Sequence, residues 1–278
     1  MSLYQYSRSA NQSSFRSDSP LSNETIARYA PSVLATEAHH TRGDRYTFIP
    51  TINVIDGLRA NGFEPYEVRQ TRVRNADRRE HTKHMVRLRH PDAISTTSEV
   101  PELILLNSHD GTSSYQLLSG FFRFVCSNGL IAGDVTNDIR IRHSGNVVDD
   151  VIEGSYQVIE NVNALAERID TYKSIQLTNE EQYLLADAAA QYRWGDNHGL
   201  TNIRQINGLN RWEDQGDSLW LTFNRIQENM IKGGMTGRSK TGRRTRTREV
   251  GGVSENVKLN RALWTLADEF AKLKQNQI

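Results

Sequence analysis

The spacing of hydrophobic positions changes near residue 150. Before it, short segments alternate apolar and polar residues with a period of two, which is typical of strands. After it, apolar residues recur every three or four positions, which predicts helices over 151–173, 178–192, 218–231 and about 254–274. Because strands come first and helices follow, the pattern predicts an α+β fold, with an N-terminal mixed sheet and a C-terminal helical portion, instead of repeated βαβ units.

Two segments of the first half predict a β-hairpin with a basic face. They are FEPYEVRQTRVR (63–74) and KHMVRLRH (83–90), and both alternate apolar and basic residues. The connecting stretch, NADRREHT, is typical of a turn. We expect the arginines to face solvent and Phe63 to lie in the core. For Tyr66 two interpretations stay open, since its ring can stack on a nucleic-acid base or pack in the core.

Further elements are predicted on either side of this hairpin. Thr51 caps a helix over 52–60 that ends at Asn61-Gly62. SNETIARYAPSVLA, from Ser22, starts a short helix that Pro31 ends or kinks. Residues 102–107 suit a buried strand, 138–143 alternate again, and 114–129 are interpreted as a strand followed by a helix. The stripe of that second helix is Leu117, Leu118, Phe121, Phe122 and Val125.

These elements predict three regions along the chain. Residues 1–40 form a mobile N-terminal arm, rich in Ser, Asn and Gln over its first 22 residues, together with the short helix. Residues 41–150 form the α+β core with the basic hairpin. Residues 151–278 form the helical region, which contains a loop rich in Gly and Arg at 233–252.

The composition excludes several classes of protein. The 278 residues carry a formal net charge of +1, and the mean hydropathy is −0.63. No apolar run approaches the roughly 20 residues that span a bilayer, and the first residues lack the apolar core of a signal peptide. The single cysteine, Cys126, allows no intramolecular disulfide. We therefore expect a cytoplasmic protein with no membrane partner.

The positive charge is concentrated in two places, the hairpin and the loop GGMTGRSKTGRRTRTREVGG. This loop holds one Lys and five Arg, with no acidic residue before Glu249. Its glycines are expected to prevent regular structure, and the two flanking helices to present it. A charge run of this kind is either a solvated loop or an anion site, and the absence of acidic partners favours the anion site. Without an aromatic residue, it would hold a phosphate backbone and read no bases.

Candidate catalytic groups are few. In NSHDG, His109 and Asp110 follow a buried strand and suit either a general base or an ordinary Asp-Gly turn, and we favour the turn. Cys126 lies in an apolar segment and is expected to be buried and inert. His81 and His84 lack the further ligands of a zinc set.

In YRWGDNHG, Trp194 and His198 are explained equally well by a helix end or by a site. The phosphate-loop, nucleophile-elbow and dinucleotide signatures are absent from the sequence. The sequence therefore predicts neither an enzyme, nor a cofactor, nor a metal site.

Five stretches resemble a family of unknown function typified by the proteins YfjQ, YafZ and YubP. They are RYTFIPTINVIDGLRANGFEP, KHMVRLRH, PELILLNSHDGTSSYQLLSGFFRFVCSNGL, IRIRHSG and TFNRIQENMIKGGMTGRSKTGRRTRTREVGGVSENVKLNRALWTLADE. The resemblance spans roughly residues 40–275. It implies a protein of conjugative plasmids and prophages in a bacterial cytoplasm, and it supplies no activity.

Mobile elements commonly carry strand-annealing proteins similar to the Red beta recombinase of phage lambda, which have a helix–hairpin core and a basic groove and form rings or filaments. This analogy leads to the hypothesis of a cofactor-free protein that binds and anneals single-stranded DNA, with duplex DNA or RNA as open alternatives, and that forms a homo-oligomer. The expected contact residues are Tyr66, Arg69, Arg72, Arg74, Lys83, Arg87, Arg89, Lys232, Arg238, Lys240, Arg243, Arg244, Arg246 and Arg248.

Two other hypotheses stay open. The chain can be an interaction protein that blocks a host defence system, with the basic loop displacing a nucleic acid. It can also be a nuclease or another hydrolase using His109, Asp110 and His143.

Overall fold

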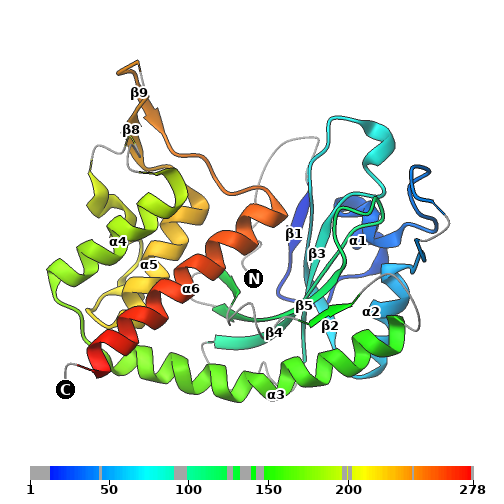
Figure 1. The fold of residues 1–278 in the computed structure, drawn as a ribbon, viewed down its shortest axis with the longest axis horizontal. Coiled ribbons are helices and arrows are strands. Elements are labelled where there is room, and N and C mark those ends of the chain that lie inside the picture. Colours follow the sequence, from blue (N-terminus) through cyan, green and yellow to red (C-terminus); the bar gives the residue numbers. More distant parts are fainter. Residues whose placement is uncertain are drawn as a thin grey trace. The chain divides into compact units, whose positions relative to one another are not determined.

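A computed structural model gives the fold of the chain (Figure 1). It describes residues 13–43, 46–90, 99–123, 128–131, 139–141, 147–195, 199, 202–239 and 241–276. The chain divides into two compact units. Unit 1 comprises residues 1–97, 101–118 and 139–158, and unit 2 comprises 98–100, 119–138 and 159–278. Each unit is described by itself.

The strands of the first half build one sheet. Its order is β1-β2-β3-β4-β5-β6, with β7 beside β5. The pairs β1–β2, β2–β3, β3–β4, β5–β6 and β5–β7 are antiparallel. The strands are β1 (Ser14–Arg16), β2 (Glu64–Gln70), β3 (His84–Arg89), β4 (Glu99–Asn107), β5 (Tyr115–Arg123), β6 (Asn128–Ile131) and β7 (Ile139–Ile141). The predicted hairpin therefore exists, with β2 and β3 as its arms.

The short helices of unit 1 begin and end where the sequence predicts. The hydroxyl of Ser22 caps α1 (Asn23–Tyr29), and Pro31 starts the 3₁₀ helix η1 (Pro31–Leu34). Helix α2 (Thr51–Ala60) ends at Asn61, and Gly62 has a φ of +84°. One detail differs, because Thr51 is the first residue of α2 and its hydroxyl binds buried histidines instead of capping the helix.

The predicted helix after residue 114 is wrong. Residues 115–123 form the strand β5, which pairs with β6 and β7. Eight of these nine residues are buried, so both faces of the strand are covered and alternation is lost. An apolar run buried on both faces has no period that separates a strand from a helix. Val125 and Cys126 lie outside the described residues.

The helices of the second half confirm the predicted pattern. They are α3 (Val147–Ser174), α4 (Asn179–Trp194), α5 (Leu219–Lys232) and α6 (Val253–Gln275), with 3₁₀ turns η5 (Ile203–Asn207) and η6 (Trp212–Asp214). Thr178 and Glu181 form a reciprocal capping box at the start of α4, and Ser218 caps α5. With the sheet before them, these helices make the fold α+β, as predicted.

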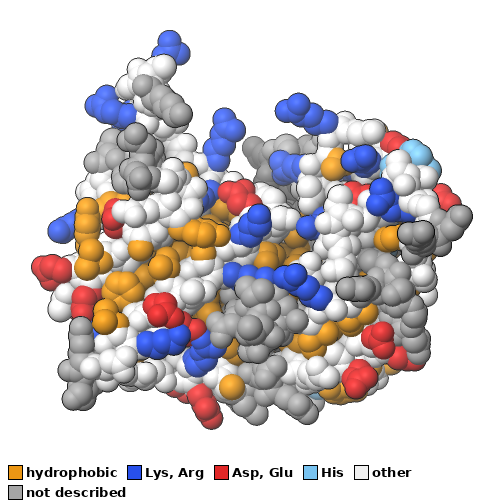
Figure 2. Space-filling model, in the orientation of Figure 1, with side chains coloured by type: hydrophobic (Ala, Val, Ile, Leu, Met, Phe, Trp, Pro, Cys, Tyr) orange, Lys and Arg blue, Asp and Glu red, His pale blue; other side chains and the backbone are white. Residues whose placement is uncertain are grey.

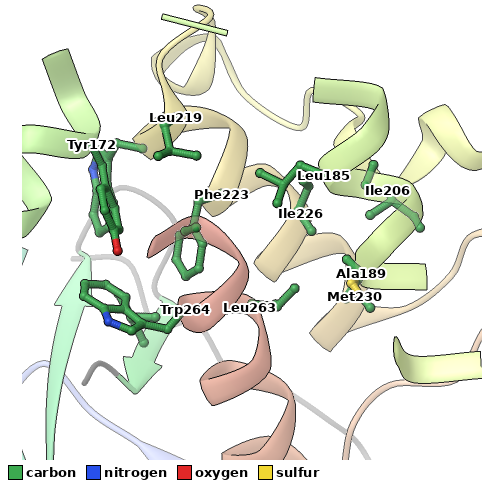
Figure 3. Close-up of a cluster of buried hydrophobic side chains, with 14 of the residues drawn as sticks. Tyr172, Leu185, Ala189, Ile206, Leu219, Phe223, Ile226, Met230, Leu263 and Trp264 are labelled. Atoms are coloured by element: carbon green, nitrogen blue, oxygen red, sulfur yellow. The ribbon is translucent and has the colours of Figure 1, made fainter. Parts of the chain in front are cut away.

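The core of unit 2 lies between α4, α5, α6 and the end of α3 (Figure 3). Trp264 is fully buried and packs against Tyr172 and Phe223, at ring-centroid distances of 5.3 and 6.0 Å. Leu263 and Met230 lie in the same cluster. This packing fixes the ends of α5 and α6, and the basic segment 233–252 connects those two ends. Among the described residues, no helix is long and apolar enough to cross a membrane.

Candidate nucleic-acid interface

The basic segment forms a hairpin, which corrects the prediction of an irregular loop. Its strands are β8 (Thr236–Arg238) and β9 (Arg244–Arg246), and they pair antiparallel. Arg238 lies opposite Arg244, and Thr236 lies opposite Arg246. Because residues that face each other across a ladder share one side of it, and alternate residues of a strand do too, the three arginines project from one face.

This face carries positive charge without an acidic partner in the described part of the chain. Arg238, Arg244 and Arg246 are exposed. Arg238 donates to the carbonyl of Gly242 at 3.2 Å, and among the described residues no acidic side chain forms an ion pair with any of the three. Figure 2 shows basic side chains at the end of this hairpin, with no acidic side chain among them on the visible face. Like charges directly opposite in a ladder destabilise it. An anion bound at this face would therefore relieve the repulsion between the arginines.

Backbone bonds and glycines shape the hairpin. Gly242, with a φ of +78°, donates its N–H to the carbonyl of Ser239 at 2.8 Å and so closes the turn. At the base, Gly234 N donates to Thr247 O and Thr247 N to Met235 O, both at 2.9 Å. Gly233 has a φ of +68°, and a β-carbon there would lie 2.6 Å from the carbonyl carbon of Arg248. Only glycine fits at position 233 without moving the second arm of the hairpin.

Side chains from the helical core hold the hairpin base. The amide of Gln205 in η5 accepts from Thr236 N at 2.8 Å and donates to Thr236 O at 3.1 Å. Arg193 at the end of α4 donates to the carbonyls of Met230 and Arg248. Burial lowers the pKa of Arg193, and the charge of Glu255 opposes that shift. The hairpin therefore stands on a rigid base, as binding segments often do.

The arginines of the first hairpin are arranged differently, in an ion-pair network inside unit 1. Arg87 donates to Glu102 at 2.5 Å, and Arg89 donates to the other oxygen of Glu102 at 2.9 Å. Glu67 accepts from Arg16 at 2.8 Å, and Arg69 and Arg87 lie 3.4 and 3.6 Å from its oxygens. Arg16, Glu67, Arg69, Arg87, Arg89 and Glu102 together form the Arg–Glu network.

The network sets the protonation of Glu67. Burial alone would raise the pKa of Glu67, but the combined charges of Arg16, Arg69 and Arg87 and the hydrogen bond from Arg16 lower it to about 2. Burial also lowers the pKa of Arg89, which the charge of Glu102 opposes. Glu67 is thus a carboxylate at neutral pH, and it neutralises part of the positive charge predicted for a basic face.

The prediction that β2 and β3 expose a basic face is therefore wrong. Arg87 and Arg89 are each 1% exposed, and all six residues of β3 are buried. Tyr66 is also buried, with the guanidinium of Arg89 4.6 Å from its ring centre, so the core interpretation of Tyr66 holds. Arg69 is half-buried beside Glu67. Tyr66, Arg87 and Arg89 present no surface to a polyanion, and Arg69 presents little.

The exposed charge of this hairpin lies instead in its connection, residues 71–83. Arg72 and Arg74 are exposed, as expected, and Arg72 donates to the hydroxyl of Ser13 at 2.9 Å. Arg78 and Arg79 are exposed as well, and we did not predict them as contacts. Their place in the turn NADRREHT indicates this exposure, because a short 3₁₀ turn (η2, Ala76–Arg78) presents its side chains to solvent.

The remaining predicted contacts are distributed as follows. Arg243 and Arg248 are exposed on either side of β9, outside the paired residues of the ladder. Lys232 is exposed and pairs with Glu228 at 2.5 Å. Lys83 is half-buried, and Lys240 lies outside the described residues. The structure thus retains eight predicted basic side chains at the surface: Arg72, Arg74, Lys232, Arg238, Arg243, Arg244, Arg246 and Arg248.

The candidate catalytic pair forms a turn and a buried network. The carboxylate of Asp110 accepts from the N–H of Thr112 at 3.0 Å and from its hydroxyl at 2.5 Å, which is an Asx turn. His109 is fully buried, and its Nε2 lies 3.1 Å from the hydroxyl of Thr51. His84 Nε2 binds the same hydroxyl at 3.0 Å, and Asn107 donates to it at 2.9 Å.

This histidine network is sealed in the core of unit 1. Tyr115 donates to the carbonyl of Ile49 at 2.7 Å, and burial raises its pKa well above the usual range. Next to the Asp110 turn, burial first and then the charge of Asp110 raise the pKa of Tyr46 to about 12. The geometry matches the interpretation of a turn, and it places His109 in the core. His143 and His198 lie outside the described residues.

Comparisons with known proteins place the chain in a family. No solved structure matches it. It is 50% identical over 253 residues to the UPF0380 protein YfjQ of Escherichia coli K12, covering 91% of this chain and 92% of that protein. It is 49% identical over 253 residues to the UPF0380 protein YafZ of the same organism, with the same coverage. A family model described as a domain of unknown function, DUF932, matches residues 38–264, and the chain therefore belongs to this uncharacterised family.

Proposed function

We propose that this protein binds nucleic acid through the β8–β9 hairpin, and that its activity is the annealing of single-stranded DNA without a cofactor. The observation that carries the proposal is the face of Arg238, Arg244 and Arg246, which is exposed and has no acidic partner in the described part of the chain. Guanidinium groups bind phosphate oxygens with two parallel hydrogen bonds, so such a face suits a phosphate backbone.

The chemistry of the hairpin favours backbone binding over base recognition. It contains no aromatic residue on which a base could stack. Small hydroxyl residues, Thr241 and Ser239, stand at its turn and can add bonds to phosphate. A protein that holds the backbone and leaves base edges free is compatible with pairing of a second strand. Annealing also requires no catalytic group, and His84 and His109 of unit 1 are sealed in its core.

Salt-dependent binding tests the first half of the proposal. Fluorescence anisotropy of a labelled single-stranded oligonucleotide is measured over a series of salt concentrations. We expect affinity to fall linearly on a log–log plot, as counterion release requires. Replacing Arg244 and Arg246 by alanine should weaken binding at low salt and reduce the slope by roughly 1.4, because each phosphate contact on a single strand contributes about 0.7.

A matched control removes the same charge elsewhere in unit 2. Lys258 and Lys272 are exposed on α6, away from the β8–β9 hairpin, and both become alanine. This variant should retain the wild-type slope. If the two variants lose affinity equally, binding reflects only net charge, and the hairpin is not the interface. Addition of the complementary strand then tests annealing, and pairing no faster than without protein would restrict the function to binding.

A second candidate, binding to a host protein as an antagonist of defence, is favoured by exposed apolar side chains in unit 2. Trp212 is 78% exposed and Leu209 is 52% exposed, on the segment that follows η5. Large apolar side chains at the surface are typical of protein contacts. No binding of DNA at low salt, together with a host protein that is captured by the wild type and lost on Trp212→Ala, would favour this candidate.

A further inference from the structure

Three titratable side chains from distant parts of unit 1 converge beside the connection of the β2–β3 hairpin. They are His39 and His40, which follow η1, and Asp77 in η2. His39 Nε2 lies 3.1 Å and His40 Nδ1 3.7 Å from the same oxygen, Oδ2 of Asp77. One ligand atom of each residue lies within 4.8 Å of those of the other two. Three ligand atoms at this spacing can hold a metal ion.

We propose that His39, His40 and Asp77 bind a divalent transition-metal ion of the Zn²⁺ class. Zinc binds imidazole nitrogen and carboxylate oxygen at about 2.0–2.2 Å, so tetrahedral ligand atoms lie about 3.3 Å apart. The separations of 3.1 and 3.7 Å are close to this value, and small side-chain rotations complete the fit. Two nitrogens and one oxygen exclude Mg²⁺ and Ca²⁺ as preferred ions, because these ions prefer oxygen ligands.

The backbone holds the site in place. His39 N donates to the carbonyl of His109 at 3.0 Å, and His109 N donates to the carbonyl of His81 at 2.8 Å. The segment with His39 and the end of the hairpin connection are thus both tied to His109, just beyond the end of β4. Asp77 is fixed on its own side, since Asn75 caps its N–H at 3.1 Å. A site that is ordered before the ion arrives loses less free energy on binding.

The neighbours of the ligands fit this role. His39 is 2% exposed, and its Nδ1 lies 2.8 Å from the hydroxyl of Thr41, which can accept a hydrogen bond from the ring N–H and orient the ring. The side chains of His40 and Asp77 are 71% and 56% exposed, so an ion reaches the site from solvent. The ring of His81 lies 5.3 Å from that of His39, and its buried Nδ1 finds no partner in the described part of the chain. A water molecule or His81 can complete the fourth position.

The ion would hold the exposed arginines of the hairpin connection in one arrangement. Asp77 lies between Arg74 and Arg78, while His39 and His40 belong to a separate segment about 38 residues earlier in the chain. Joining them closes a long loop and restricts the movement of residues 72–80. The site thus regulates the order of a basic surface, and it does so independently of the β8–β9 hairpin.

Titration of the tag-free full-length chain with Co²⁺ and then Zn²⁺ tests the proposal. We expect visible absorption bands of bound Co²⁺ that saturate near one equivalent, disappear when Zn²⁺ displaces the ion, and are absent with Mg²⁺. His40→Ala and Asp77→Asn should each weaken binding at least about tenfold. Both side chains are mostly exposed, so the fold should persist in far-UV circular dichroism. His90→Gln, at the histidine that follows the far end of β3, is the control and should bind as the wild type does.

Limited trypsin digestion gives an independent readout. Zn²⁺ should slow cleavage after Arg74, Arg78 and Arg79 in the wild type and leave it unchanged in His40→Ala. Cleavage after Arg244 and Arg246 in unit 2 is the internal control and should not respond. Absence of bound Co²⁺, or equal binding by the wild type and both ligand variants, would overturn the site. Binding without protection of the connection would overturn its ordering role.

Discussion

The two hairpins of this protein share a sequence signature and differ in what surrounds it. In both, arginines alternate with other residues along short antiparallel strands. In the β2–β3 hairpin the arginines of β3 are 1% exposed and paired with Glu67 and Glu102. In the β8–β9 hairpin three arginines share an exposed face without an acid beside them in the described part of the chain. The first set stabilises a fold, and the second is available to a ligand.

The difference shows that partners decide the role of a charged strand. Glu102 belongs to β4 and lies 15 residues after Arg87 in the sequence, so the hairpin segment by itself contains only one of the two acids that neutralise it. Glu67 lies on β2, directly opposite Arg87. In the β8–β9 hairpin the opposite position holds another arginine. Four predictions test this contrast, from the largest expected effect to the smallest.

Removal of the charge of Glu102 should have the largest effect. Glu102→Gln leaves Arg87 and Arg89 buried beside a neutral amide, and breaking a buried pair in this way costs about 3–5 kcal/mol of unfolding free energy. Denaturant unfolding followed by far-UV circular dichroism measures the loss. All four tryptophans lie in unit 2, so tryptophan fluorescence reports that unit separately.

The control for this variant is Glu80→Gln, in the connection of the same hairpin. Glu80 is exposed, so its loss should change the unfolding free energy by less than about 0.5 kcal/mol. Equal effects of the two substitutions would show that the Arg–Glu network does not stabilise unit 1. The β2–β3 hairpin would then differ from the β8–β9 hairpin only in how exposed its arginines are.

Acid should weaken the same network. The pKa of Glu67 is lowered to about 2, so its carboxylate stabilises the folded state fully above the unfolded pKa of about 4.5, and this contribution is lost as pH falls from 4.5 towards 2. A shift of this size corresponds to roughly 3 kcal/mol. Unfolding free energies of the wild type and Glu67→Gln, measured from pH 6 down to about pH 2.5, should converge. A constant difference would contradict the assignment.

Gly233→Ala should displace the β8–β9 hairpin without removing any charge. A β-carbon there meets the backbone of Arg248 and Thr247, at 2.6 and 2.8 Å, in a left-handed conformation. We expect a loss of about 2 kcal/mol in unit 2 and weaker binding of single-stranded DNA. Gly234→Ala is the matched control, because its φ is also positive but nothing lies within 4 Å. It should cost about 1 kcal/mol and keep its DNA affinity.

Much of the fold could be predicted because its signals are local. The stop at Asn61-Gly62, the cap at Ser22 and the four helices after residue 147 depend on neighbouring residues, and all are present. The strand β5 was missed because burial of both faces removes its period. The irregular loop predicted at 233–252 was also wrong. Its glycines occupy turns with positive φ at 233, 234 and 242, and they permit a hairpin.

The site could be predicted only in part. The exposed arginines of β9 follow from a run without acidic residues, which is visible in the sequence. The burial of Arg87 depends on Glu102, and the cluster of His39, His40 and Asp77 depends on the path of the chain over about 38 residues. Such contacts leave no periodic pattern, because the partners belong to different elements. Tertiary structure alone brings them together.

The smallest predicted effect separates binding from stability within the second hairpin. Arg244 lies directly opposite Arg238, and like charges in that position destabilise a ladder. Arg244→Thr removes the repulsion and adds a β-branched residue, so the unfolding free energy of unit 2 should rise by about 0.2–1 kcal/mol while the affinity for single-stranded DNA falls. Arg243→Thr, which removes the same charge from outside the shared face, should leave stability unchanged. A fall in stability on Arg244→Thr would mean that Arg244 is part of the fold, as Arg87 is, and the contrast between the two hairpins would no longer hold.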